Sequence, residues 1–144
     1  MSSQSPGALL DTSFLIDYTD RTPETKAFLT EYKGERNEPI SIPTLVLYEM
    51  YRGRLHSDGP ADIPDLDYKL RWANTVGFDR YSALEAAEIE SELASQGELI
   101  NGADILIAGI ARRKEMLLVT ADGDFSNVKS LDVFDVREDS VDSL

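Results

Sequence analysis

Short runs of consecutive hydrophobic residues alternate along the chain with longer segments in which hydrophobic residues return every three or four positions. The short runs predict buried strands, and the longer segments predict amphipathic helices. Strands that alternate with helices are typical of an α/β fold, here a central, mostly parallel sheet of four to five strands flanked by helices. The strands are expected at residues 8–10, 39–42, 76–78, 117–119 and 133–134.

Capping and terminating residues mark the ends of the helices. Thr12 or Ser13 is expected to cap the first helix, and Gly34 to follow the end of the second. Ser82 and Glu85 form the pattern of a capping box for a later helix. Helices are therefore predicted to begin near residues 12, 23, 43, 66, 82 and 104.

A chain of 144 residues has the usual size of one domain. We expect the domain over residues 8–136, a flexible tail over 1–7 and an acidic tail over 137–144. Residues 56–67 contain two prolines, one glycine and four aspartates, and predict an acidic loop. No signal peptide and no hydrophobic stretch that would span a bilayer is recognisable, so we expect a cytoplasmic protein without a membrane partner.

The residue types present exclude several kinds of chemistry. The chain has no cysteine, which excludes disulfides, thiolate metal sites and cysteine nucleophiles. Its single histidine, His56, excludes any mechanism that needs two histidines in one chain. Carboxylates and hydroxyls are therefore the main candidates for chemistry.

Acidic residues outnumber basic residues by 27 to 14, which gives a net charge of −13 at pH 7. A field of this sign repels polyanions, so we expect no direct DNA binding by this chain alone. Local arginines remain able to contact a phosphate, and Arg52 and Arg112 are the candidates. The even spread of acidic residues resembles the surface of halophilic proteins, with an acidic mesophilic protein as the alternative.

Several carboxylates occupy positions where an isolated charge is costly. Asp11 and Asp122 follow predicted strands, with Asp124 close behind, and Glu49 and Asp104 lie in hydrophobic helices. Because parallel strands end at one edge of the sheet, where ligands bind in such folds, these acids are expected near one another. Buried carboxylates need a partner, and all-oxygen ligands favour Mg²⁺ or Mn²⁺. Such a site is suited to the hydrolysis of a phosphodiester.

Each acid also has a purely structural interpretation. Asp11 and Asp104 are common types of helix cap, and Asp122 with Asp124 suits a turn. Glu49 is spaced to pair with Arg52 on the surface of a helix. The metal-site hypothesis therefore depends on the whole set and not on any single residue.

In chain order, these motifs resemble those of the PIN-domain nucleases, and most closely the VapC-like toxins of toxin–antitoxin pairs. The likeness runs from Leu9 to about Asp135 and includes a glycine, Gly109, where alanine is more usual. The matching segments are LLDTSFLID (9–17), EMYRG (49–53), DILIAGIA (104–111) and LVTADGDF (118–125).

The resemblance implies a metal-dependent endoribonuclease that uses Mg²⁺ or Mn²⁺ and leaves a 5′-phosphate. Asp124 corresponds to an acid that either ligates the metal or orients it, and Thr12 and Thr120 to hydroxyls near the metal or the phosphate. The residues that match catalytic, metal-binding acids are Asp11, Glu49, Asp104 and Asp122.

The same resemblance implies an RNA substrate, a small antitoxin protein that covers the site, and a homodimer. Two alternatives stay within the family: a PIN nuclease of RNA maturation, and an inactive PIN-like module that binds RNA or protein. A phospho-receiver or an aspartyl-phosphate hydrolase fits less well, because the latter needs a second aspartate where this chain has Ser13.

Overall fold

Five parallel strands form one sheet in the order β3-β2-β1-β4-β5. The computed structural model describes residues 5–57 and 59–144, so the first four residues of the predicted tail and residue 58 of the predicted loop lie outside the described residues. The strands are β1 (Ala8–Leu10), β2 (Ile40–Pro43), β3 (Asn74–Val76), β4 (Leu117–Thr120) and β5 (Val133–Asp135). The α/β class and the parallel sheet agree with the prediction, and β3 begins two residues earlier than expected.

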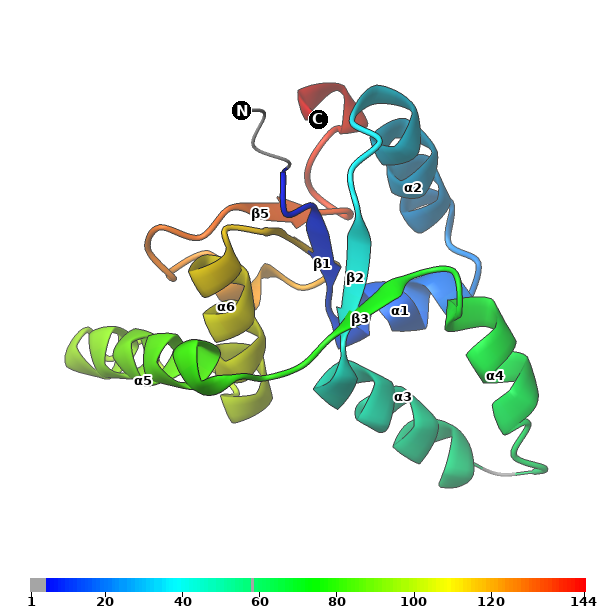
Figure 1. Cartoon of the computed structure of the whole chain (residues 1–144), viewed down its shortest axis with the longest axis horizontal. Coiled ribbons are helices and arrows are strands. Elements are labelled where there is room, and N and C mark those ends of the chain that lie inside the picture. The colour runs from blue at the N-terminus through cyan, green and yellow to red at the C-terminus, as the bar shows by residue number, and fades with distance from the viewer. Residues whose placement is uncertain (1–4, 58) are drawn as a thin grey trace.

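Helices connect the strands and cover the sheet. Figure 1 shows α5 and α6 on one side, and α1, α2 and α4 on the other. Two short 3-10 turns, η1 (Gly123–Phe125) and η2 (Val141–Ser143), follow β4 and β5. The helices are α1 (Thr12–Thr19), α2 (Pro23–Glu35), α3 (Thr44–Leu55), α4 (Ile63–Leu70), α5 (Arg80–Ser95) and α6 (Gly102–Lys114).

The centre of the sheet is fully buried because helices cover both of its faces. The three residues of β1 have no exposed surface, which explains why this strand is a continuous hydrophobic run. Leu10 is in register with Val119 of β4, and the N–H of Asp11 donates to the Val119 carbonyl. This pairing places the residue after β1 beside Thr120, the last residue of β4.

Aromatic side chains fix the helices that start from the carboxyl edge of the sheet. The Phe28 ring of α2 lies 5.8 Å from Phe14 of α1, 5.3 Å from Tyr32 and 5.2 Å from Phe134 of β5, centroid to centroid. Edge-to-face and offset contacts of this kind add to the free energy of burial. They hold the first turn of α1 against the sheet.

Helices α5 and α6 approach each other closely at Gly109. A Cβ at this position would lie 2.7 Å from the Ala86 Cβ and 2.8 Å from the Ser82 carbonyl oxygen. Glycine therefore permits the close packing of the two helices. The close contact with α5 therefore explains why this position is glycine and not the more usual alanine.

Two helix caps differ from the prediction. Asp11, and not Thr12 or Ser13, caps α1, because its side chain accepts a hydrogen bond from a backbone N–H of the first turn; the structural interpretation of Asp11 as a cap is thus confirmed. The predicted capping box is also wrong. Asp79 caps α5, and Ser82 lies within the first turn, where its N–H donates to the Asp79 carboxylate.

Two segments predicted to be irregular are partly ordered into helical turns. α4 begins at Ile63, so the predicted loop over 56–67 is wrong in its second half; the proline that suggested a loop stands in the first turn, where helices tolerate it. In the predicted tail over 137–144, Val141 and Leu144 pack against the core. The acidic side chain between them, Asp142, stays exposed.

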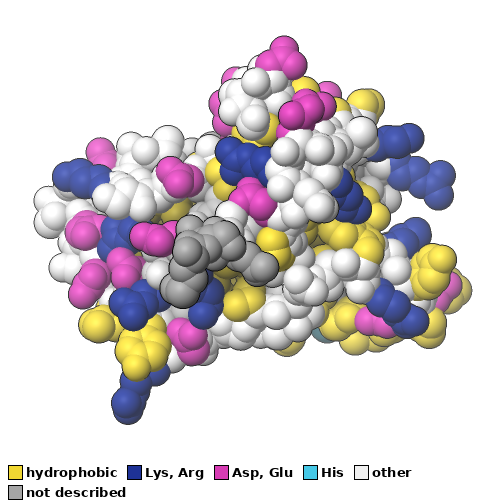
Figure 2. Space-filling model, turned by 45° about the horizontal axis from the view of Figure 1, so that its top comes forward, with side chains coloured by type: hydrophobic (Ala, Val, Ile, Leu, Met, Phe, Trp, Pro, Cys, Tyr) yellow, Lys and Arg dark blue, Asp and Glu magenta, His cyan; other side chains and the backbone are white. Residues whose placement is uncertain are grey.

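The surface carries charges of both signs. Figure 2 shows acidic side chains at several separate places on one face, with basic side chains between them. Some form ion pairs one helical turn apart, as Lys69 does with Asp65 and Arg71 with Asp67. In the part of the chain that the structure describes, no helix is long and apolar enough to cross a membrane.

Candidate active site

The carboxyl edge of the sheet brings together residues that are far apart in the sequence. Asp11 follows β1, and Thr120 ends the neighbouring strand β4, just before Asp122. The Thr120 hydroxyl donates to Asp11 Oδ2, and Asp122 N donates to the Thr120 hydroxyl oxygen at 3.0 Å. The predicted site residues of the first and last motifs are therefore in direct contact.

Three donors hold the Asp11 carboxylate in one orientation. Oδ1 accepts hydrogen bonds from Phe14 N at 2.9 Å and from Ser13 Oγ at 2.8 Å, and Oδ2 accepts from Thr120. Ser13 Oγ in turn accepts from Ala121 N at 3.0 Å. Hydrogen bonds that donate to a carboxylate favour its ionised form.

A carboxylate offers about four lone pairs, so one position on Asp11 Oδ2 remains for a further ligand. Burial raises the pKa of Asp11, and the donors from Thr120, Phe14 and Ser13 oppose that increase. Asp11 is almost completely buried, with 2% of its surface exposed. A buried, oriented carboxylate with a free lone pair is suited to bind a cation.

Asp104 joins the cluster from the other side of the sheet. It lies in the first turn of α6, a helix that Asn101 caps. Partial burial raises the pKa of Asp104 to about 6, and the negative charges of neighbouring carboxylates add to the effect. Those neighbours are Asp11, Asp122, Asp124 and Glu49. The structure therefore brings the other four predicted acids within electrostatic reach of Asp104.

Asp122 and Asp124 form the exposed side of the cluster. Asp122 Oδ1 accepts a hydrogen bond from Asp124 N at 3.1 Å and so caps η1. The charge of Asp122 raises the pKa of Asp124. Glu49, half-buried on α3, forms no ion pair with Arg52 within the described residues, contrary to the structural alternative.

The donor set fits a divalent cation in its chemistry. Five carboxylates and nearby hydroxyls are all oxygen ligands, the type that Mg²⁺ and Mn²⁺ prefer. Among the described residues, however, no three acidic side chains stand in an arrangement that holds one ion. Repulsion between ionised carboxylates opposes their closer approach. The buried Thr12 hydroxyl, next to Asp11 in sequence, has no hydrogen-bond partner among the described residues.

Arg137, a cation beside the acidic cluster, was not among the predicted site residues. It follows β5 at the carboxyl edge and forms a two-pronged pair with Asp17 of α1, with N–O distances of 2.9 to 3.1 Å. Arg137, Asp122 and Ser13 line the same cavity. Asp17, an acid on the buried face of a hydrophobic helix, was the one available signal that such a partner exists.

The two arginines proposed for RNA contact differ in their surroundings. Arg112 is largely buried and forms ion pairs with Glu85 at 2.7 Å and Glu92 at 2.9 Å, both on α5. These bonds take up its guanidinium, so a phosphate contact by Arg112 is not supported. Arg52 is exposed on α3 beside Tyr48, and its role stays a prediction.

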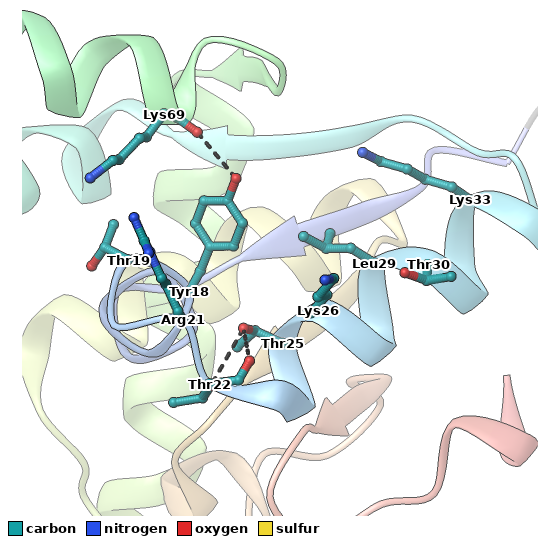
Figure 3. Close-up of a pocket in the computed structure, with 10 residues that line it drawn as sticks. All are labelled: Tyr18, Thr19, Arg21, Thr22, Thr25, Lys26, Leu29, Thr30, Lys33 and Lys69. Carbon is teal, nitrogen blue, oxygen red and sulfur yellow. Dashed lines mark hydrogen bonds between the residues drawn. The ribbon is translucent and has the colours of Figure 1, made fainter.

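A separate groove lies between α1, α2 and α4, and its lining is drawn in Figure 3. Its volume is about 540 Å³. The Tyr18 hydroxyl donates to the Lys69 carbonyl at 3.4 Å, and the Tyr18 ring packs edge-on against Trp72. Apolar Tyr18 and Leu29 contribute to its lining together with four basic residues, Arg21, Lys26, Lys33 and Lys69.

Comparisons with known proteins agree with this architecture. The family model of the PIN domain matches residues 8–131. VapBC2 of Rickettsia felis, solved with promoter DNA, is similar at a TM-score of 0.80 and 22% identity, over 90% of this chain and 98% of that chain. DNA-bound VapBC of Salmonella typhimurium is similar at a TM-score of 0.78 and 19% identity, over 90% of this chain and 98% of that chain. PAE2754 of Pyrobaculum aerophilum is similar at a TM-score of 0.60 and 17% identity, over 94% of this chain and 93% of that chain. At these identities the structures show the shared fold, and no curated protein matches the sequence.

Proposed function

Because the chain belongs to the PIN-domain family, we propose that it is a metal-dependent endoribonuclease, the toxin component of a toxin–antitoxin pair. PIN domains are generally nucleases, which places the chain among hydrolases that act on nucleic acids. One observation carries the proposal: Asp104 lies among four other carboxylates, and burial together with their charges raises its pKa to about 6. Such clusters of perturbed acids are typical of functional sites.

The metal would be Mg²⁺ or Mn²⁺, held by Asp11, Glu49, Asp104 and Asp122, with Asp124 as a ligand or an orienting residue. A bound ion of this kind activates water and stabilises the charge that develops on the phosphate. The product ends would be a 5′-phosphate and a 3′-hydroxyl.

The neighbouring hydroxyls have supporting roles in this proposal. Ser13 and Thr120 donate to Asp11, so they oppose the rise in its pKa that burial causes and help to orient its carboxylate. Contacts behind a ligand of this type commonly tune its affinity for metal. Thr12, whose buried hydroxyl has no partner within the described residues, is available to bind water or phosphate oxygen in the site.

The antitoxin is proposed from the structural neighbours and from the groove in Figure 3. The related VapBC structures from Rickettsia felis and Salmonella typhimurium are complexes of this kind. The groove combines apolar surface at Tyr18 and Leu29 with lysines and an arginine, and so fits an amphipathic helix with acidic residues. A homodimer is a further part of the proposal. A nuclease of RNA maturation is the second candidate, distinguished by the lack of an antitoxin.

The test is cleavage of total RNA by the purified protein in high salt, with Mn²⁺ or Mg²⁺ against EDTA. Asp11→Asn should abolish cleavage and leave the fold intact, because asparagine also caps helices. Asp20→Asn, an exposed acid at the end of α1, is the matched control and should cut normally. Undiminished cutting by folded Asp11→Asn would refute the acidic-site model. Metal-independent cutting would refute the metal requirement.

A further inference from the structure

Arg137 is the cation that the fold brings to the acidic edge of the sheet. Its Nε donates to Asp17 Oδ2 at 3.1 Å, and its Nη2 donates to Oδ1 at 2.9 Å and to Oδ2 at 3.0 Å. The Asp17 side chain is only 11% exposed, whereas the Arg137 side chain is 60% exposed. A buried carboxylate thus anchors one side of the guanidinium and leaves the other side open.

The count of donors shows what remains open. A guanidinium has five N–H groups, and the pair with Asp17 uses Nε and Nη2. Within the described chain, Nη1 of Arg137 donates no hydrogen bond. Nη1 and the second proton of Nη2 form a planar fork, the geometry that matches two oxygens of a phosphate.

Arg137 lines a cavity together with Asp122, one of the proposed metal ligands. A cavity of about 650 Å³ is lined by Arg137, Asp122, Ser13 and Gly123 among others. A side chain at Gly123 would meet no other atom, so the cavity is open there. Ser13 and Asp122 both contact the Asp11 network through Thr120, the residue that ties the strand ends together.

The surrounding charge favours a second phosphate contact. The chain has a net charge of −13, and five carboxylates gather at this edge, so a nucleic acid backbone is repelled wherever no cation faces it. A metal ion offsets this charge only at the phosphate that it touches. A fixed positive group beside the acidic cluster would offset this charge at a neighbouring phosphate.

We propose that Arg137, held in place by Asp17, binds the backbone phosphate next to the bond that is cut. This inference rests on the proposed nuclease function and assigns a substrate contact to it. Arg137 touches the substrate, and Asp17 is a positioning residue that acts through Arg137. The contact is to the backbone, so it adds affinity for any RNA sequence and carries no base specificity.

The probe is a 5′-fluorescein-labelled, mixed-sequence RNA of 12 nucleotides. Its binding is measured by anisotropy in the uncut Asp11→Asn background, and its cleavage is measured in the wild-type background. Arg137→Ala should raise Kd and KM about tenfold with a smaller effect on kcat. It should also reduce the slope of log K against log salt by about 0.7, the loss of one phosphate contact to a single strand.

Two further variants separate charge from geometry. Arg137→Lys keeps the charge without the fork, so it should restore the salt slope but only part of the affinity. Asp17→Asn should raise KM with the slope unchanged, because the charge stays but is no longer fixed. Arg36→Ala is the matched control: Arg36 pairs with Glu38 at 3.6 Å beyond the end of α2, at the opposite edge of the sheet.

The outcomes distinguish the two proposals. If Arg137→Lys and Arg137→Ala fold, cut and bind this RNA as Arg36→Ala does, the pair with Asp17 is only structural and the inference is overturned. If Arg137→Ala does not fold, the same measurements of Kd, KM and salt slope on Arg137→Lys and Asp17→Asn decide whether Arg137 contacts the RNA. A wild-type protein that neither binds nor cuts this RNA overturns the proposed function and the inference together.

Discussion

Asp104→Asn should stabilise the metal-free protein at neutral pH, although it removes a proposed metal ligand. In the folded chain, burial and four neighbouring carboxylates raise the pKa of Asp104 from 3.8 to about 6. Its ionised form is therefore less favourable in the folded state than in the unfolded state. Asparagine has nearly the same shape without the charge, so it removes this cost.

The magnitude follows from the shift. A change of about two pKa units corresponds to about 3 kcal/mol, at 1.36 kcal/mol per unit. Because the Asp104 side chain is half-buried and water screens part of the repulsion, about half of that remains. The favourable interaction of the carboxylate with the amino end of α6, about 0.3–1 kcal/mol, is also lost. The expected net gain is about 1 kcal/mol, or about 4 °C in Tm.

The effect depends on pH in a defined direction. The folded pKa lies above the unfolded one, so the folded state binds the proton more tightly, and the cost is largest above pH 6. As the pH falls through 6 towards 4, the wild-type carboxyl becomes neutral in the folded state and the cost disappears. Asp104→Asn should therefore exceed the wild type in stability at pH 7.5 and equal it near pH 4.

The assay is urea unfolding in EDTA at pH 4, 6 and 7.5, with Asp20→Asn as the control for loss of an exposed charge. A repeat with saturating Mn²⁺ should reverse the order, because a ligand at 100 times its Kd stabilises the wild type by about 2.7 kcal/mol. The reasoning would be refuted if Asp104→Asn were less stable than the wild type at pH 7.5, or if the difference did not change with pH.

Three further substitutions test the packing and the network. Gly109→Ala should lower the free energy of unfolding by about 1–3 kcal/mol because the new Cβ overlaps α5, whereas Gly34→Ala, which meets no atom, should be neutral or slightly stabilising in the same urea titration. Arg112→Ala should destabilise the protein by about 1–3 kcal/mol in thermal unfolding, because it leaves the partly buried Glu85 carboxylate unpaired. KM for RNA should stay unchanged, and a raised KM would restore Arg112 as a candidate substrate contact. Thr120→Val should lower the free energy of unfolding by about 1–3 kcal/mol at pH 7 and weaken Mn²⁺ binding, because Asp11 loses a hydrogen-bond donor. Calorimetric titration with Mn²⁺ measures the affinity, and an unchanged affinity would contradict this prediction.

The sheet was predictable because its central strands are buried on both faces and so appear as unbroken hydrophobic runs. β1 and β4 stand where those runs predicted them. The meeting of Asp11 with Asp122 followed from one further rule, that parallel strands end at the same edge. Boundaries were less certain where local signals compete: α5 begins two residues before Ser82 because Asp79 supplies the cap.

Contacts between distant segments were beyond the reach of local patterns. Arg137 and Asp17 are 120 positions apart, and their pairing depends on how β5 and α1 meet at the sheet edge. Arg112 was assigned to a phosphate because an arginine on a helix has the right donors, but α5 supplies carboxylates that no pattern on α6 could predict. Sequence therefore located the acids, whose positions are tied to strand ends, but not their cationic partners.

Asp11 accepts more hydrogen bonds than a helix cap requires. As a cap of α1, Asp11 needs only one bond, from Phe14 N. Ser13 and Thr120 add two hydroxyl donors, and both oppose the rise in the pKa of Asp11 that burial causes. A cap alone gains nothing from this, since a neutral asparagine caps equally well. Donors beyond those that a cap needs, on a buried carboxylate that faces other acids, support the proposal that a cation binds there.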